Sequence, residues 1–500
     1  MPYADYEAVI GLEVHCQLRT ESKAFSPEPA VFGAAPNTLV DPVSLGHPGT
    51  LPVLNERLVD FTIRMGLATH SRIAPRSVFA RKHYFYPDLP KGYQISQYET
   101  PLCEGGYVEI EVEADDGALQ RRRIRLTRIH MEEDAGKLLH DQDPTATLID
   151  HNRCGVPLIE IVSEPDLRTP AEAARYMQKI RQIVRYLGIC DGNMEEGSLR
   201  CDANVSVRRK GETRLGTKTE VKNLNSFRHV ERALAYEIRR QIRLLEAGGE
   251  VVQETRLWDA TRQETRPMRS KEEAHDYRYF PDPDLVPVVV TEERLARVRA
   301  SLPELPEARR RRYETVWQLP AYDAGVLTEE RGVADYFEAT VAALVAGAPP
   351  GEHPALVKAA SNVIMTDVLR LLGERGLDIA AFPVEPERLA ALVRLRRDDR
   401  INSSAATELL ERMMDDDRDP ETLAGALNLL QVSDEGALLP VVEDVLDRHP
   451  KQLQQYLQGK ESLIGFFIGQ VMRAFPGSPD PRTVRALLTE RLAARREASG

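Results

Sequence analysis

A carboxylate and an imidazole lie two residues apart in a strand-like segment near the start of the sequence. The run from Tyr6 to Leu18 has apolar side chains at every second position, while Glu13 and His15 share the opposite face. Side chains two apart on one strand face are about 7 Å apart, so both can reach one metal ion or phosphate. For this pair alone, the solvated outer face of a half-exposed strand is the simpler explanation, and other segments must decide.

A loop and an acidic turn supply further charged groups. Lys82 and Lys91 lie in the proline-interrupted segment 81–94 among several tyrosines, and lysine suits recognition of phosphate or carboxylate as a point charge. The segment 132–134 has three consecutive carboxylates, which repel one another unless a cation or protons neutralise them. A tyrosine–lysine packing cluster and an exposed acidic turn are the respective alternatives.

Three more strand-like segments combine polar groups with apolar neighbours. Glu160 lies within the apolar run 158–162, and a buried carboxylate must be paired, protonated or bound to a metal. Arg153 is an obvious structural partner, so this segment alone leaves metal binding undecided. Two further runs have polar outer faces, for which a solvated face is again the alternative. These faces carry Asp202, Asn204, Ser206, Glu220 and Lys222.

Taken together, these segments indicate metal-dependent phosphoryl transfer on a β-sheet. The candidate oxygen and nitrogen ligands are Glu13, His15, Glu133, Glu160, Asp202 and Glu220. Oxygen-rich sites with one imidazole favour Mg²⁺ or Mn²⁺, and the lysines supply counter-charges for phosphates. The sequence has neither a Walker A loop nor a G-x-G-x-x-G motif, so a nucleotide would be held by an antiparallel sheet with metals. The residues alone leave fold and substrate open.

The elements that must position these groups divide the chain into a strand-rich part and a helical part. At 500 residues the chain is too long for one core. Residues 1 to about 290 alternate like strands, with helices expected over 170–187 and 226–247 and a proline-rich strand over 279–290. From 292 onward the sequence is helical. We expect domains at 1–291, 292–410 and 411–500.

One hairpin changes phase shortly before the acidic turn. Val108, Ile110 and Val112 alternate with glutamates over 107–113, a turn follows at 115–117, and the segment 121–131 returns as the partner strand. Its apolar residues are even-numbered at first and odd-numbered at the end. This shift predicts a β-bulge near Thr127-Arg128, which would re-aim the side chains that follow it.

Charge and cysteine content exclude some classes of protein. A net charge of −12 argues against a general nucleic-acid coat, although arginine clusters leave room for a local basic surface. Five scattered cysteines without a C-x-x-C pair offer no disulfide framework. No apolar run reaches the length of a membrane span, and the start of the chain lacks the layout of a signal peptide. We therefore expect a cytoplasmic protein without membrane partners.

Several long motifs, in the same order along the chain, resemble one family. They lie at 10–15, 81–88, 130–137, 157–165, 194–204, 276–281, 319–323 and 459–472. In these segments the chain is similar to the B subunits of the aspartyl/glutamyl-tRNA(Asn/Gln) amidotransferases, the GatB/GatE family. The resemblance covers nearly the whole sequence.

The resemblance implies a fold and an activity. The fold would be α+β: an antiparallel-sheet cradle domain resembling glutamine synthetase, then an all-α helical domain, then a small YqeY-like tail that contacts tRNA. The enzyme would be a glutamine-dependent carbon–nitrogen ligase (EC 6.3.5.-), converting Glu-tRNA(Gln) or Asp-tRNA(Asn) to the amide. ATP would be a substrate and Mg²⁺ or Mn²⁺ the cofactor. The implied partners are the amidase subunit of a heterotrimer, which supplies ammonia, its small third subunit, misacylated tRNA and a non-discriminating aminoacyl-tRNA synthetase.

The resemblance also implies residue roles. Glu13, His15, Glu133 and Glu160 would bind the metal. Lys82 would face the nucleotide or acyl phosphate, while Lys91 and Glu133 would lie where the ammonia passage opens. The nucleotide would be bound by Lys82, Asp202, Asn204, Glu220 and Lys222.

The chain departs from the family pattern at one stretch. Many members have paired cysteines that form a zinc site in the stretch corresponding to 25–49, whereas this stretch has none here, so we expect no structural zinc.

Two other functions remain alternatives. A free-standing ligase for a small acid would not need the helical third of the chain. A non-catalytic tRNA scaffold would not need clustered carboxylates or Lys82.

Overall fold

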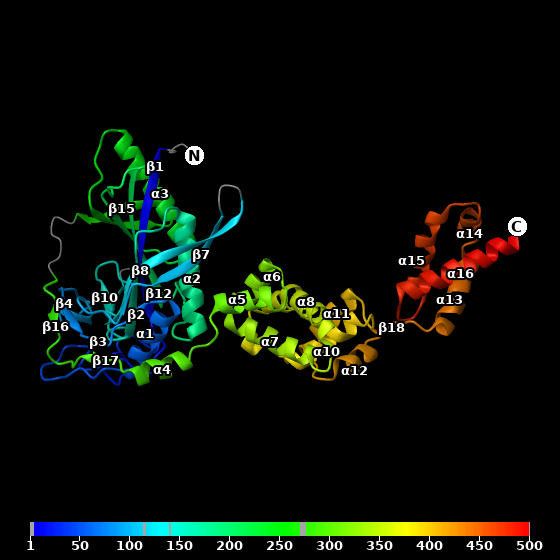
Figure 1. The fold of residues 1–500 in the computed structure, drawn as a ribbon, viewed down its shortest axis with the longest axis horizontal. Coiled ribbons are helices and arrows are strands. Elements are labelled where there is room, and N and C mark those ends of the chain that lie inside the picture. Colours follow the sequence, from blue (N-terminus) through cyan, green and yellow to red (C-terminus); the bar gives the residue numbers. More distant parts are fainter. Residues whose placement is uncertain (1–4, 114–116, 140–141, 271–276, 500) are drawn as a thin grey trace. The chain divides into compact units, whose positions relative to one another are not determined.

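The computed structural model describes residues 5–113, 117–139, 142–270 and 277–499. They form two compact units, Met1–Pro306 and Glu307–Gly500. The first unit contains a large sheet with helices, and the second is almost entirely helical (Figure 1). None of the helices in the described ranges is both long and apolar enough to cross a membrane.

The first unit is organised by a 10-stranded sheet with β1 near its centre. In spatial order the strands are β15 (Glu264–Ser270), β14 (Glu254–Asp259), β13 (Thr219–Lys222), β12 (Leu199–Arg209), β1 (Tyr6–Gln17), β11 (Pro157–Ser163), β8 (Leu119–Glu133), β6 (Cys103–Glu104) and β2 (Arg72–Ile73), and β7 (Tyr107–Glu113) also pairs with β8. Both neighbours of β1 run antiparallel to it. However, β13 and β14 are parallel, so the sheet is mixed rather than purely antiparallel as the sequence predicted.

The predicted alternation of β1 is confirmed. Ile10, Leu12 and Val14 are buried, whereas Glu13 and His15 on the other face are partly exposed. The apolar face shares one core with helices α1 (Glu56–Ala68), α2 (Pro170–Leu187) and α3 (Phe227–Glu246). Burial of that face therefore holds the polar face of the strand in a fixed position.

The two helices predicted in this part of the chain are confirmed to within a residue at each end. Thr169 caps α2 by accepting a hydrogen bond from the Glu172 amide, and Gly188 ends the helix in the left-handed conformation at φ 68°. The Glu172 carboxylate accepts from the Arg168 amide, one residue before the expected partner in a capping box. Ser226 caps α3 in the same way as Thr169 caps α2.

The predicted bulge in β8 is also confirmed. Val162 of β11 is opposite Arg128 of β8, but the next residue, Ser163, is opposite Leu126. Thr127 is therefore the extra residue, and the side chains that follow it change face. As a result His130 and Glu132 lie on the same face of the sheet as Glu160, which is directly opposite His130.

The prediction of one proline-rich strand over 279–290 is wrong. Only two short pieces pair there: β16 (Phe280–Pro281) with β4 (Ala80–His83), and β17 (Val288–Val289) with β3 (Arg76–Ser77). Three prolines in this stretch have no amide hydrogen to donate, which interrupts a continuous ladder.

The predicted turn at 115–117 lies largely outside the described residues. Further strands are β5 (Tyr93–Ser96), β9 (Lys137–Leu139) and β10 (Leu148–Asp150).

The second unit contains two hydrophobic cores among its described residues. One extends from Tyr313 to Ala424 and the other from Leu438 to Leu492. Its elements are α5 (Pro306–Thr315), α6 (Ala321–Leu327), α7 (Arg331–Val345), α8 (His353–Val363), α9 (Leu369–Arg375), α10 (Pro386–Arg397), α11 (Ser403–Met413), α12 (Pro420–Ala426), α13 (Glu435–Arg448), α14 (Pro450–Leu457), α15 (Ile464–Ala474) and α16 (Pro481–Ser499), with the short pair β18 (Gln431–Val432) and β19 (Ser478–Pro479).

The domain boundaries expected near 291 and 410 stay predictions. Helix α4 (Glu292–Ala300) begins at the first of them and contacts α1 in the first unit, where Arg294 bonds Asp60. The second boundary falls inside α11, and α11 and α12 contribute to the same core.

The close packing of α1 on β6 generates a test of this core. A Cβ on Gly66 would lie 2.5 Å from Cys103 Sγ and 2.6 Å from Ile73 Cδ1, so Gly66→Ala forces neighbours apart. We expect a loss of about 1–3 kcal/mol in the free energy of unfolding of the first unit, measured by urea denaturation. The control is Gly373→Ala in α9, where a Cβ meets nothing within 4 Å, and where alanine should stabilise by roughly 0.5–1 kcal/mol. An unchanged midpoint for Gly66→Ala would contradict the packing.

Candidate active site

The strand register assembles a polar surface on the open face of the central sheet. His15 of β1 is opposite Glu160 of β11 on one side and Arg200 of β12 on the other. Two residues before His15 and on the same face of β1, Glu13 is opposite Asp202 of β12. The acidic and imidazole side chains that the sequence places on separate strands therefore become direct neighbours across the sheet.

Two of these groups, His15 and Glu160, form a compact cluster with Glu132 of β8. We call His15, Glu132 and Glu160 the His15 cluster. One potential ligand atom from each lies within 4.8 Å of the others. The His15 Nε2 atom is 3.4 Å from a carboxylate oxygen of Glu160 and 4.0 Å from one of Glu132. Two carboxylates and one imidazole are a fitting donor set for Mg²⁺ or Mn²⁺.

Glu132 was not among the predicted site residues, whereas its neighbour Glu133 was. Successive side chains of a strand point to opposite faces, so the two glutamates cannot both join the cluster. The bulge contains the signal that could have distinguished them, because after Thr127 the even-numbered positions of β8 lie on the polar face. Glu132 is almost fully buried and accepts a hydrogen bond from the Ser96 hydroxyl.

The acidic and basic groups in and around the His15 cluster stabilise one another in their charged forms. Burial raises the pKa of Glu160, but the imidazoles of His130 and His15 and the ammonium of Lys82 outweigh it and hold that pKa below its ordinary value. Burial has the opposite effect on an imidazole and lowers the pKa of His15. The hydrogen bond to Glu160 and the charges of Glu160 and Glu132 outweigh burial and raise this pKa to about 9. In the absence of a metal ion, a proton on His15 therefore partly neutralises these carboxylates.

A second group of side chains lies beside this cluster. The Asn204 amide donates to Glu13 Oε1 at 3.0 Å. Lys222 Nζ is 2.9 Å from Asp202 Oδ2 and 3.4 Å from Glu220 Oε1. Four of the five residues predicted to bind a nucleotide, Asp202, Asn204, Glu220 and Lys222, are thus neighbours on β12 and β13.

Glu13 lies between the two groups. Burial raises its pKa, and the charges of Glu160, Asp202 and Glu220 raise it further. An ionised Glu13 would therefore be stabilised by a cation bound near it. His15 supplies one such charge, since it lowers the pKa of Glu13. Burial lowers the pKa of Lys222, but Asp202 and Glu220 raise it above its ordinary value.

Lys82 reaches the His15 cluster from β4. Its ammonium lies 4.9 Å from the centre of the Tyr277 ring. Burial lowers the pKa of Lys82, but Glu132, Tyr279 and Glu160 raise it above its ordinary value. Lys82 is therefore a cation that interacts electrostatically with the carboxylates of the cluster, and lysine suits recognition of phosphate as a point charge.

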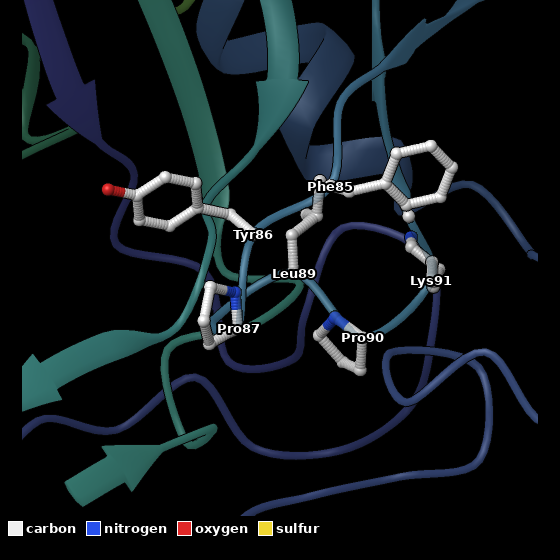
Figure 2. Close-up of a pocket in the computed structure, with 7 residues that line it drawn as sticks. Phe85, Tyr86, Pro87, Leu89, Pro90 and Lys91 are labelled. Atoms are coloured by element: carbon white, nitrogen blue, oxygen red, sulfur yellow. The ribbon is translucent and has the colours of Figure 1, made fainter. Parts of the chain in front are cut away.

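Lys91 and Glu133 form a separate ion pair. Both side chains are almost completely buried, and the same Glu133 oxygen accepts from the Ile95 amide at 3.0 Å. Lys91 follows the loop 85–90, which lines a cavity of about 520 Å³ (Figure 2). Figure 2 shows Phe85 and Tyr86 directed to different sides of this loop. The structure thus brings Glu133 together with Lys91, as one predicted role requires, and does not bring it into the His15 cluster.

Two further cavities border the polar face of the sheet. One, of about 830 Å³, is lined in part by Arg19, Arg200 and Asp202. The other, of about 280 Å³, is lined in part by Glu13, Asn204 and Lys218. Together they offer space of the size that small-molecule and nucleotide ligands occupy.

The mixed sheet, its clustered carboxylates and the lysines Lys82 and Lys91 define an enzyme domain suited to metal-assisted chemistry on phosphates. The chain belongs to the GatB/GatE family. The family model of the GatB/GatE catalytic domain matches residues 8–296, and that of the GatB domain, with a YqeY region, matches residues 335–492. The second match includes parts of both helical regions expected from the sequence.

Curated relatives match over nearly their full length. A Salinibacter ruber protein, named as the B subunit of aspartyl/glutamyl-tRNA(Asn/Gln) amidotransferase, is 60% identical over 99% of this chain and 99% of its own. Proteins of the same name from Thermosynechococcus vestitus and Halorhodospira halophila are each 54% identical over 97% of this chain, covering 96% and 99% of their own lengths.

The separation of Glu132 from Glu133 predicts different effects on metal binding. We expect Glu132→Gln to weaken Mn²⁺ binding to the full-length chain by at least about 10-fold, because it removes a charged ligand. Its matched control, Glu133→Gln, should leave Mn²⁺ affinity within about 3-fold of wild type, because Glu133 faces Lys91. Electron paramagnetic resonance of free Mn²⁺ in a titration measures both. The reverse order of effects would contradict this assignment.

Proposed function

We propose that this chain is the B subunit of a tRNA-dependent amidotransferase, which activates and amidates the side-chain carboxylate of Glu-tRNA(Gln) or Asp-tRNA(Asn). The observation that carries the proposal is the His15 cluster, whose carboxylates raise the pKa of the nearby Lys82, on a chain similar over 99% of its length to a protein of that name. The groups of this face are buried or partly exposed on a sheet, and sites built on strands are held more precisely than sites on loops.

The reaction has two steps. A carboxylate is a poor acyl donor, because oxide or hydroxide would have to leave. In the first step a carboxylate oxygen attacks the γ-phosphorus of ATP, and the bond between that phosphorus and the oxygen of ADP breaks. In the second step ammonia attacks the acyl carbon, the carbon–oxygen bond to phosphate breaks, and ammonia loses a proton. The products are the amide, ADP and phosphate.

Each group on the sheet face has a place in this scheme. His15, Glu132 and Glu160 would hold Mg²⁺ or Mn²⁺, with Glu13 beside them. When bound, the ion supplies positive charge that offsets the negative charges of phosphate and carboxylate. Lys82 stabilises the transferred phosphoryl group electrostatically, as a cation held in place before the reaction begins.

The nucleotide lies, in this proposal, on the side of β12 and β13. Lys222 is held by Asp202 and Glu220, and Asn204 is held by Glu13, so these polar groups are oriented before a ligand binds. Lys218 lines the adjoining cavity and adds a cation for phosphate. This arrangement, with a nucleotide on an open sheet face, is the basis on which we propose a likeness to glutamine synthetase.

The remaining parts of the proposal concern partners. Ammonia comes from glutamine through an amidase subunit, with a small third subunit and a non-discriminating aminoacyl-tRNA synthetase as further partners in the cytoplasm. The YqeY-like tail contacts the tRNA, and a small substrate would require no such extension of the chain. We propose that the chain after the sheet domain divides into a helical domain, 292–410, and the YqeY-like tail, 411–500.

Lys82 provides the direct test of the proposed function. With the partner proteins, Mg²⁺-ATP, ammonium chloride and radiolabelled Glu-tRNA(Gln) or Asp-tRNA(Asn), we expect Lys82→Ala to lower the rate of amide formation by about 10²–10³-fold. The control is Lys210→Ala, an exposed lysine just beyond β12, which should retain the wild-type rate. Full activity of Lys82→Ala would place the chemistry elsewhere and favour a scaffold function.

The Lys91–Glu133 pair predicts a defect that appears only after activation. Glu133→Gln removes the carboxylate that could take a proton from ammonium while leaving Lys82 in place. We expect amide formation to fall by about 10²-fold, while ATP hydrolysis that depends on misacylated tRNA continues. Lys210→Gln is the matched surface control. Equal loss of ATP hydrolysis and amide formation would assign Glu133 to activation rather than to the delivery of ammonia.

A further inference from the structure

A second imidazole, His130, lies against the His15 cluster and has no role in the scheme above. Its Nε2 atom is 3.6 Å from a carboxylate oxygen of Glu132 and 3.6 Å from one of Glu160. The side chain is almost fully buried. By distance alone, either His15 or His130 could be the nitrogen ligand of a metal ion bound by these two carboxylates.

The other nitrogen of His130 distinguishes the two imidazoles. Arg128 Nε donates a hydrogen bond to His130 Nδ1 at 3.3 Å. A guanidinium has only donors, so Nδ1 must be the acceptor and cannot carry the proton. In the neutral ring the proton is therefore on Nε2, the atom that faces the carboxylates.

We propose that His130 is a positioning residue that presents an N–H group to Glu132 and Glu160, and that His15 alone supplies the nitrogen ligand. A nitrogen that carries a proton has no free lone pair for a metal ion. Instead, the N–H of His130, 3.6 Å from an oxygen of each carboxylate, favours their ionised forms electrostatically and can donate a hydrogen bond after a small shift. This inference rests on the metal site in the proposed function and adds the way in which that site is oriented.

The bulge in β8 makes this arrangement possible. Because Thr127 is the extra residue, Arg128, His130 and Glu132 follow one another on the polar face of the strand. Arg128 sets the tautomer of His130, and His130 in turn faces Glu132 on its own strand and Glu160 on β11. A single irregularity in the ladder thus supplies three consecutive members of the polar face.

Pulsed electron paramagnetic resonance of Mn²⁺ bound to the full-length chain tests the proposal, because a directly bound imidazole nitrogen modulates the echo. We expect the modulation of one nitrogen in wild type and its loss in His15→Ala. His130→Ala should keep the modulation but bind Mn²⁺ about 10–100-fold more weakly. His130→Gln, whose amide restores an N–H group, should recover most of that affinity. Thermal unfolding checks that each variant is folded.

The possible failures are distinguishable. Loss of nitrogen modulation in His130→Ala, or two bound nitrogens in wild type, would overturn the role of His130 and leave the metal site intact. Affinity in His130→Ala equal to that of wild type would also overturn it. Wild type without bound Mn²⁺ would instead refute the metal site itself, and this inference with it.

Discussion

Mutual repulsion among carboxylates is the constraint on which the rest of this structure depends. Glu13, Glu132, Glu160, Asp202 and Glu220 are drawn together on one sheet face. Like charges at short range in a partly buried setting oppose folding unless cations or protons offset them. The nearby cationic and imidazole side chains, Lys82, Lys222, His15 and His130, supply that compensation. A site already arranged in this way is ready to exchange protons and lysine contacts for a metal ion and phosphates.

The energy that keeps these groups together comes from the opposite side of the sheet. The apolar residues of β1 and of its neighbours share one core with α1, α2 and α3, and hydrophobic burial there determines which face each strand presents. A shift of register by one residue would bury Glu13 and His15 and expose Leu12 and Val14. The core therefore determines the geometry of the site, although its own side chains point away from it.

Much of this arrangement follows from the sequence, because periodicity reflects burial. The alternation of β1, the ends of α2 and the bulge at Thr127 were each predictable from the types of residues and their spacing. The pairing of strands far apart in the chain is not encoded by local pattern, so the neighbours of Glu13 and His15 could not be derived. Glu132 and Glu133 differ in face because successive side chains of a strand point to opposite sides, and the phase change at Thr127 is the sequence signal that bears on them.

The arginine clusters illustrate a second limit. In the sequence, Arg121 to Arg123 and Arg309 to Arg312 resemble basic patches. In the structure, Arg123 pairs with Glu109, and Arg309 pairs with Asp335 and Glu338. Their charges are compensated by acidic residues that lie far away in the sequence or on an adjacent strand. Charge runs in a chain therefore predict free positive surface only after their partners are known.

The central claim is that this sheet face activates a carboxylate by phosphorylation, and an isotope experiment tests it most directly. Misacylated tRNA with ¹⁸O in both oxygens of the side-chain carboxylate would be amidated by the complex with ATP and ammonia, and the released phosphate analysed by mass spectrometry. Attack of that carboxylate on the γ-phosphorus predicts one ¹⁸O atom in each phosphate formed. Phosphate without ¹⁸O would show that the carboxylate oxygen leaves by another route, and would contradict the account.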